Sequence, residues 1–298
     1  MNKNQAIDPL SIPVLSKIFS SSVLTQLAKN GKSKLLTSLA IESELEQLCG
    51  DKSLSTSFDF KYSKLKDAYR NEYFYKNIIA NKILLGRHSL NTASMHTEFR
   101  VGDSKADVLI LNGTSHIYEI KTELDSLDRL DGQLSDYVKF SEYVTIVTAE
   151  KHIQKLAQRT PNTIGIIALT NEGRLKTIRT AESGKSRLEN SLIFDSLQRA
   201  EYTNIIKNLT GAIPEVSNGL MYKECKSIFE GLNTLDIHHL VVNTLKRRHM
   251  DEKAKEFIHS VPVSLKAAAT SIKFTKVQRS NLLSALDKSL SNALYAPT

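Results

Sequence analysis

Residues 107–121 read DVLILNGTSHIYEIK, and this stretch decides the fold that we expect for the chain. Two apolar runs flank an Asn-Gly pair, which is typical of a tight turn between two antiparallel strands. The first run opens on Asp107, and the second closes on Glu-Ile-Lys at 119–121. Charged side chains therefore stand at the ends of strands that otherwise look like core, and they need a functional explanation.

Six short runs rich in β-branched residues indicate strands. They lie at 96–101, 106–112, 116–122, 143–149, 164–170 and 174–180. Between the third and fourth runs, apolar residues with helical spacing predict an amphipathic helix; its apolar face consists of Leu127, Leu130, Leu134, Tyr137 and Val138. A second helix is expected at 151–159, and the last two runs are expected to pair as a hairpin. The order from residue 62 is then helix, three strands, helix, strand, helix and two strands, which is an α/β class.

The two ends of the chain show helical patterns instead of strand patterns. One pattern covers 12–50, a linker-like stretch follows at 49–57, and a longer helix is expected at 62–85. After about residue 185 only helical patterns remain. We therefore expect a helical N-terminal region (1–61), an α/β core (62–185) and a helical C-terminal region (186–298).

Composition narrows the classes to which the chain can belong. It has 298 residues, a formal net charge of +8 and two cysteines, Cys49 and Cys225, which excludes a disulfide framework and a cysteine-based zinc site. No stretch resembles a signal peptide or approaches the roughly 18 apolar residues of a membrane span, so a cytoplasmic protein without membrane contact is expected. The basic excess favours a polyanionic partner such as nucleic acid.

The length of the turn decides whether the charged residues can act together. Side chains alternate between faces along a strand, so Glu119 and Lys121 share one face. A two-residue Asn-Gly turn would put Asp107 opposite Tyr118 and therefore on the other face. A three-residue turn with the glycine at positive φ would bring Asp107 beside Glu119. The residues alone allow both turns.

The chemistry favours the three-residue turn. Two converging carboxylates bind a hard divalent cation such as Mg²⁺ or Mn²⁺ through oxygen. Such a cation polarises a phosphoryl oxygen and activates water, and a nearby ammonium group can orient that water. We therefore predict Asp107, Glu119 and Lys121 on one face, with the two carboxylates within about 6 Å of each other so that they share one metal. Gly113 or a close neighbour is expected at positive φ, with a β-bulge that absorbs the extra residue.

An aspartate, a spacer of eleven residues and Glu-x-Lys on an apolar strand resemble the PD-(D/E)xK phosphodiesterase superfamily, which includes restriction endonucleases. Ala106 stands where the name of the superfamily has proline. The resemblance implies a restriction-endonuclease-like core and a nuclease that depends on Mg²⁺ or Mn²⁺. DNA is the expected substrate, although the residues do not separate DNA from RNA. It also implies Asp107, Glu119 and the Ile120 carbonyl as metal ligands and Lys121 as the catalytic lysine.

Further positions fit the same resemblance. Glu72 lies where members carry an acidic residue on the first core helix, and Glu98 begins the first strand, where only some members bind metal. Gln133 and Tyr137 form a Q-x-x-x-Y pattern that is similar to one in some helicase-nucleases and in a small bacterial and phage branch. Gln133 is expected to act in catalysis and Tyr137 at the nucleic acid. The remaining expected nucleic-acid contacts are Lys105, Arg129, Lys246, Arg247 and Arg248.

Structural roles compete with these assignments. Asp107 could cap a strand, Glu72 and the basic residues at 246–248 could lie on solvated helices, and the Q-x-x-x-Y pair could be helix surface and core edge. Two other functions also stay open. One is a catalytically inactive or regulatory nucleic-acid-binding protein on the same fold. The other is an interaction protein whose helical regions bind a partner, with a homodimer or partner contact through the C-terminal region. Neither needs a divalent metal, so metal binding separates both from a nuclease.

Overall fold

The computed structural model describes residues 16–42, 52–248 and 250–295. The chain divides into two compact units. The sheet unit spans Arg87–Met250, and the helical unit combines the residues up to Gly86 with those from Asp251 onward. This division does not follow the expected boundaries after residues 61 and 185, because the helices directly after the sheet share its core and the later ones belong with the N-terminal helices.

One mixed sheet of six strands forms the centre of the sheet unit, with the strands neighbouring each other in chain order. The strands are β1 (Ser94–Val101), β2 (Ser104–Leu111), β3 (Ser115–Lys121), β4 (Tyr143–Ala149), β5 (Gly165–Leu169) and β6 (Leu175–Arg179). The first three strands and the last pair are antiparallel, whereas β3, β4 and β5 are parallel. The α/β class and the expected element order are confirmed, and no described residue beyond 179 belongs to a strand.

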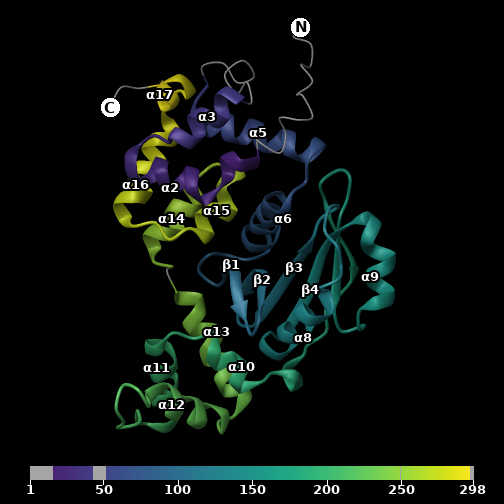
Figure 1. Cartoon of the computed structure of the whole chain (residues 1–298), viewed down its shortest axis with the longest axis vertical. Coiled ribbons are helices and arrows are strands. Elements are labelled where there is room, and N and C mark those ends of the chain that lie inside the picture. The colour runs from purple at the N-terminus through teal and green to yellow at the C-terminus, as the bar shows by residue number, and fades with distance from the viewer. Residues whose placement is uncertain (1–15, 43–51, 249, 296–298) are drawn as a thin grey trace. The chain divides into compact units, whose positions relative to one another are not determined.

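Helices supply the crossovers that parallel strands require. The crossovers are α8 (Leu130–Phe140) and the pair η4 (Glu150–His152) and α9 (Ile153–Arg159). The helices that follow the last strand are η5 (Lys185–Arg187), α10 (Asn190–Asp195), α11 (Arg199–Thr210), α12 (Met221–Glu230) and α13 (Thr234–Arg247). Helix α8 connects β3 to β4 and lies against the sheet (Figure 1). Leu130, Leu134 and Tyr137 of its predicted apolar face are buried, and Val138 is half-buried against the same core. Leu127 is also buried but lies before the helix instead of on it.

Both ends of the described chain contribute to the helical unit. Its elements are η2 (Lys17–Phe19), α2 (Ser21–Asn30), α3 (Lys34–Glu42), α5 (Leu54–Ala68), α6 (Glu72–Ile79), the π-helical turn η3 (Ala80–Leu84), α14 (Glu252–Ser260), η6 (Val263–Leu265), α15 (Lys266–Ser271), α16 (Lys276–Asp287) and α17 (Leu290–Tyr295). The short α7 (Leu85–Arg87) crosses the boundary. The buried Asn77 amide joins the two parts, since it donates to the Val263 carbonyl and accepts from the Ala267 N–H.

The single helix expected at 62–85 is wrong. The chain leaves α5 at Tyr69, and the Asn71 side chain then accepts a hydrogen bond from the Phe74 N–H and caps a new helix. Residues 12–15 and 43–50 of the expected helical stretch, Cys49 among them, lie outside the described residues. Within the described ranges, no helix is long and apolar enough to cross a membrane.

The turn between β2 and β3 contains three residues. Leu111 pairs with Ser115, and Gly113 has a φ of 67°. The predicted odd-length turn with a glycine at positive φ is therefore confirmed. The predicted bulge is wrong, because the register continues without a shift to Val108 and Tyr118. The turn alone absorbs the extra residue.

Gly113→Ala should destabilise the protein by about 1–2 kcal/mol, which is the cost of holding an L-residue at positive φ. A Cβ there would meet no atom within 4 Å, so the loss would come from the backbone alone. Gly132→Ala is the matched control, since Gly132 has equal space but lies in α8. It should stabilise by up to about 1 kcal/mol. Urea unfolding measures both, and equal effects would contradict the explanation.

Candidate functional site

The hydrogen-bonded ladder between β2 and β3 opens at the predicted carboxylates. Pairing runs from the turn as far as Val108 and Tyr118, and one further step places Asp107 opposite Glu119. There the Ile120 N–H donates to Asp107 Oδ2 at 2.7 Å, so an aspartate side chain takes a hydrogen bond of the ladder. Asp107 is half-buried. The two carboxylates are thus cross-strand neighbours, as the three-residue turn requires.

Glu119 belongs to a buried network that links β3 to α8. Its side chain accepts from Lys121 Nζ at 2.8 Å and from the Tyr137 hydroxyl at 2.9 Å, one on each carboxylate oxygen. Lys121 Nζ also donates to Gln133 Oε1 at 2.9 Å. Only 1% of Glu119 and 8% of Lys121 is exposed, so each charge is compensated by the other inside the protein.

Burial sets the ionisation of this network. It raises the pKa of Glu119, while the charge and the hydrogen bond of Lys121 oppose that rise. Burial also raises the pKa of Tyr137 far above its usual range, and the Glu119 carboxylate adds to the effect. Tyr137 therefore remains a protonated donor to Glu119 at any physiological pH.

Glu98 lies beside Asp107 on the other neighbouring strand. Its flanking residues pair with Val108 and Ala106, and a carboxylate oxygen of Glu98 lies within 4.8 Å of one from Asp107. Lys105 approaches the same glutamate, with Nζ 2.7 Å from Oε2. The backbone of Glu98 has a φ of 53°, a left-handed conformation that costs an L-residue roughly 1–2 kcal/mol. A strained residue at a carboxylate pair is a feature of functional sites.

The other predicted site residues are distributed more widely. Arg129 is exposed directly before α8, and the Ile120 carbonyl remains an expected ligand. Glu72 begins α6 in the helical unit, where it forms an ion pair with Lys76, and its metal role stays a prediction. Lys246 and Arg247 end α13, with Lys246 half-buried and Arg247 exposed.

Two residues that were expected to contact nucleic acid have partners inside the sheet unit, and their contact with nucleic acid stays a prediction. Tyr137 is fully buried and directs its hydroxyl at Glu119, so it holds a site residue in place. Arg248 is held inside the sheet unit, where its guanidinium pairs with Glu201 and lies 5.9 Å from the centre of the Phe99 ring. Sequence position alone could not distinguish these side chains from exposed ones.

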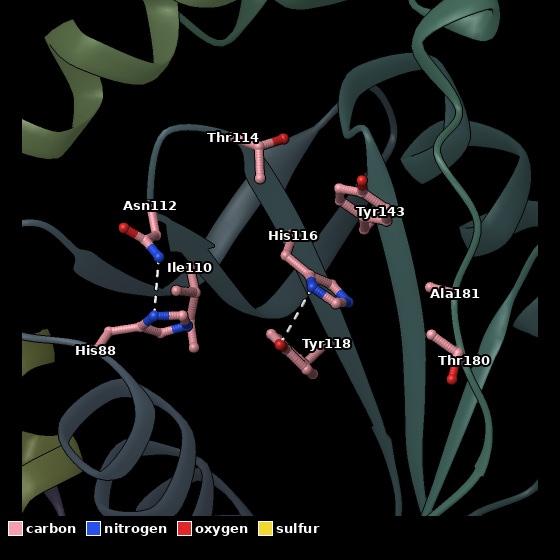
Figure 2. A pocket seen from close by; sticks show the side chains of 9 residues that line it. All are labelled: His88, Ile110, Asn112, Thr114, His116, Tyr118, Tyr143, Thr180 and Ala181. Carbon is pink, nitrogen blue, oxygen red and sulfur yellow. Dashed lines mark hydrogen bonds between the residues drawn. The ribbon is translucent and has the colours of Figure 1, made fainter.

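The opposite face of the sheet contains a separate pocket of about 240 Å³ that the sequence did not predict. Figure 2 shows His116, Tyr118 and Tyr143 on adjacent strands, with the Asn112 amide joined to His88 at one side. The His116 and Tyr118 rings stack with centroids 4.1 Å apart. These two residues alternate with Ile117 and Glu119 along β3, so period-two spacing was the signal that could have indicated an aromatic face.

His116 acts in this pocket as a neutral ring. Its two nitrogens lie 2.8 Å from Thr145 Oγ1 and 3.2 Å from the Tyr118 hydroxyl oxygen. Burial lowers the pKa of His116 to about 3, with a smaller contribution from His88. The ring is therefore uncharged at neutral pH, and the pocket is chemically distinct from the carboxylate face.

The family model described as Bacteriophage P4 protein cII matches residues 65–279. The chain belongs to the phage P4 cII family. The cII match begins within α5 and ends within α16, so both compact units contribute to it.

Individual relatives are more distant. Protein cII of Enterobacteria phage P4 is 27% identical over 148 residues, which cover 49% of this chain and 54% of that protein. The chain therefore spans about half the length of this curated relative. A solved structure, the SPO1766 protein of unknown function from Silicibacter pomeroyi, is similar over 31% of this chain and 62% of its own, with a TM-score of 0.26 and 16% identity. The name cII states no reaction.

Lys121→Met should destabilise the metal-free protein by about 3–5 kcal/mol, because it leaves the buried Glu119 without its cation. The double variant Glu119→Gln/Lys121→Met should lose less than the sum of the two single variants. Urea unfolding of all four proteins in EDTA measures the coupling, which should exceed about 1.5 kcal/mol. Additivity within about 0.5 kcal/mol would contradict a compensated pair.

His116 should make the protein sensitive to acid. Its pKa is about 6.5 in the unfolded chain and about 3 in the folded one. Below pH 6.5 only the unfolded state takes up the proton, so stability should fall with pH by up to about 1.4 kcal/mol per unit. Urea unfolding at pH 7 and pH 5 should show a smaller loss for His116→Phe than for the natural protein. A His116 ring that titrates near pH 6.5 by NMR would refute this prediction.

Proposed function

We propose that the chain is a metal-dependent nuclease of the PD-(D/E)xK type that hydrolyses phosphodiester bonds, with DNA as its substrate. One observation supports this most strongly: Asp107 and Glu119 are cross-strand neighbours where the β2–β3 ladder opens, with Lys121 on the same strand as Glu119. A strand-capping aspartate alone would not need a buried Glu-x-Lys beside it.

The donor set fits a hard divalent cation. Glu98 and Asp107 present carboxylate oxygens close to each other, and Glu119 is the neighbour of Asp107 on β3. Mg²⁺ and Mn²⁺ prefer carboxylate and carbonyl oxygens, so the proposed ligands are Asp107, Glu119 and the Ile120 carbonyl, with Glu98 as a further carboxylate. When bound, the cation would polarise a phosphoryl oxygen and lower the pKa of water.

The remaining residues position the reacting groups. Gln133 and Glu119 together hold the Lys121 ammonium group, which fixes where its positive charge meets a phosphate. Tyr137 holds the second oxygen of Glu119 and so limits rotation of the carboxylate. These contacts preorganise the site before substrate arrives, as stabilisation of developing charge requires.

One feature favours the alternative of a binding protein without catalysis. Both oxygens of Glu119 already accept hydrogen bonds, and the Lys121 ammonium group neutralises the charge of Glu119 without a bound metal ion. A closed pair of this kind can be purely structural. The two functions differ in their need for metal, which makes metal dependence the decisive measurement.

The test uses the full chain with circular, linear duplex and branched DNA and with RNA of the same sequences. Cleavage should require Mg²⁺ or Mn²⁺ and stop in EDTA. Lys121→Met should lower the rate at least about 100-fold, and Asp107→Asn should also lose metal binding by calorimetry. Lys139→Met is the control, because this lysine lies on α8 and pairs with Glu189 instead.

Each outcome separates the candidates. Cleavage that persists in Lys121→Met would indicate a contaminating nuclease. Metal binding without cleavage of any substrate would favour the inactive alternative. Absence of both metal binding and cleavage would remove the nuclease proposal.

A further inference from the structure

The basic excess of the chain is concentrated in one of its two units. The helical unit contains 19 Lys and Arg against 12 Asp and Glu, whereas the sheet unit contains 21 against 20. The sheet unit, which carries the candidate catalytic residues, is thus almost neutral overall. A polyanionic partner that responds to the net charge would be attracted mainly by the helices.

Five lysines from three distant segments meet at one end of the helical unit. Lys29, Lys32 and Lys34 surround the junction of α2 and α3, where Gly31 has a φ of 68°. A Cβ on Gly31 would lie 3.7 Å from Lys288 Nζ, which places this lysine at the same junction.

Lys52 reaches this end of the unit through the backbone. Its carbonyl accepts from the Leu290 N–H at 2.8 Å, and the Lys288 carbonyl accepts from the Leu54 N–H at 2.8 Å. Figure 1 shows α2, α3, α16 and α17 gathered there, in agreement with their packing contacts. We call Lys29, Lys32, Lys34, Lys52 and Lys288 the lysine cluster.

Helix stability explains only part of the cluster. Lys29 lies in the last turn of α2 and Lys288 directly follows α16, where a cation favourably meets the negative end of the helix dipole. Lys34 begins α3 and Lys52 precedes the cap of α5, so both stand at positive helix ends. A lysine there costs stability, but the same arrangement attracts phosphate.

Within the part of the chain that the structure describes, no ion pair compensates the cluster. Among the described residues, none of its five ammonium groups forms an ion pair, whereas other cations of the same unit do. Four members, Lys29, Lys34, Lys52 and Lys288, are exposed. Ser33 and Ser53 cap α3 and α5, which orients the first turns of both helices beside the lysines.

We propose that the lysine cluster binds the sugar-phosphate backbone of a nucleic acid independently of sequence. Several ammonium groups and two positive helix ends, spread over three segments, match a repeating polyanion better than a single phosphate. This inference goes beyond the nuclease proposal, because the binding needs neither a divalent cation nor the carboxylates of the sheet.

The test is fluorescence anisotropy of the full chain with a labelled DNA duplex of random sequence, in EDTA, over a series of salt concentrations. The cluster variant replaces the four exposed lysines: Lys29→Gln, Lys34→Gln, Lys52→Gln and Lys288→Gln. The control variant removes equal charge from exposed lysines of the same unit: Lys82→Gln, Lys253→Gln, Lys273→Gln and Lys276→Gln. Lys276 begins α16 and so also controls for a helix end.

The cluster variant should lose at least about tenfold in affinity, and its log–log salt slope should flatten by about 0.9 for each phosphate contact removed. The control should lose less than about threefold. Equal losses of affinity in both variants would indicate diffuse electrostatic attraction and overturn the proposal. Unchanged affinity of the cluster variant would overturn it too. Anionic phospholipid vesicles form a second arm. Loss of vesicle binding with intact duplex binding would assign the cluster to lipid headgroups instead.

Circular-dichroism melting of both variants confirms that each is folded. Because the anisotropy measurement is made in EDTA, which removes divalent cations, its result does not depend on whether the protein cleaves DNA. A chain that fails to cleave can still bind through the cluster, and a chain that cleaves can still lack this binding surface.

Discussion

The sheet unit depends on the buried ion pair between Glu119 and Lys121. A carboxylate with 1% of its surface exposed is stable only beside a cation, and β3 supplies that cation two residues later on the same face. Two further polar partners come from α8, as Gln133 and Tyr137 hold the two charges in place. The crossover helix is therefore fixed to β3 by polar contacts as well as by its apolar face. The same contacts bring the candidate catalytic groups together without any loop, which keeps them on rigid elements.

Much of this arrangement could be predicted from residue patterns. Short runs rich in β-branched residues indicated each strand, and the apolar stripe from Leu127 to Val138 indicated α8, because these segments pack into one core. The three-residue turn was predicted from chemistry, since a split pair of carboxylates could not hold one metal. The bulge was not needed, because Gly113 at positive φ accommodates the whole turn. The positive φ of Glu98 could not be predicted, as nothing local distinguishes a strained glutamate from an ordinary strand residue.

Tertiary context produced the features that residue patterns did not reveal. Arg248 ends a basic run that reads as solvated, but Glu201 and the Phe99 ring, both distant in sequence, hold it. Tyr137 was correctly placed on the helix after the Glu-x-Lys strand, yet the same spacing fits a ligand contact and a buried hydrogen-bond donor to Glu119 equally well. The two-unit division was missed for the same reason: Asn77 bonds residues almost two hundred positions later. The overall composition also could not reveal how the charge is distributed. The excess of basic residues lies in the helical unit, and the sheet unit is almost neutral.

The discontinuous helical unit has a consequence for biosynthesis. Its N-terminal helices leave the ribosome before the sheet unit, whereas their packing partners α15, α16 and α17 are made after it. The whole sheet unit is translated in between and has all its strands and core helices before those partners exist. Domains generally fold as units during synthesis. The sheet unit can therefore complete its core while the apolar faces of the N-terminal helices are still exposed. The helical unit can therefore fold only late, when segments that are far apart in sequence pack together. Until then its exposed apolar helix faces are binding sites for chaperones.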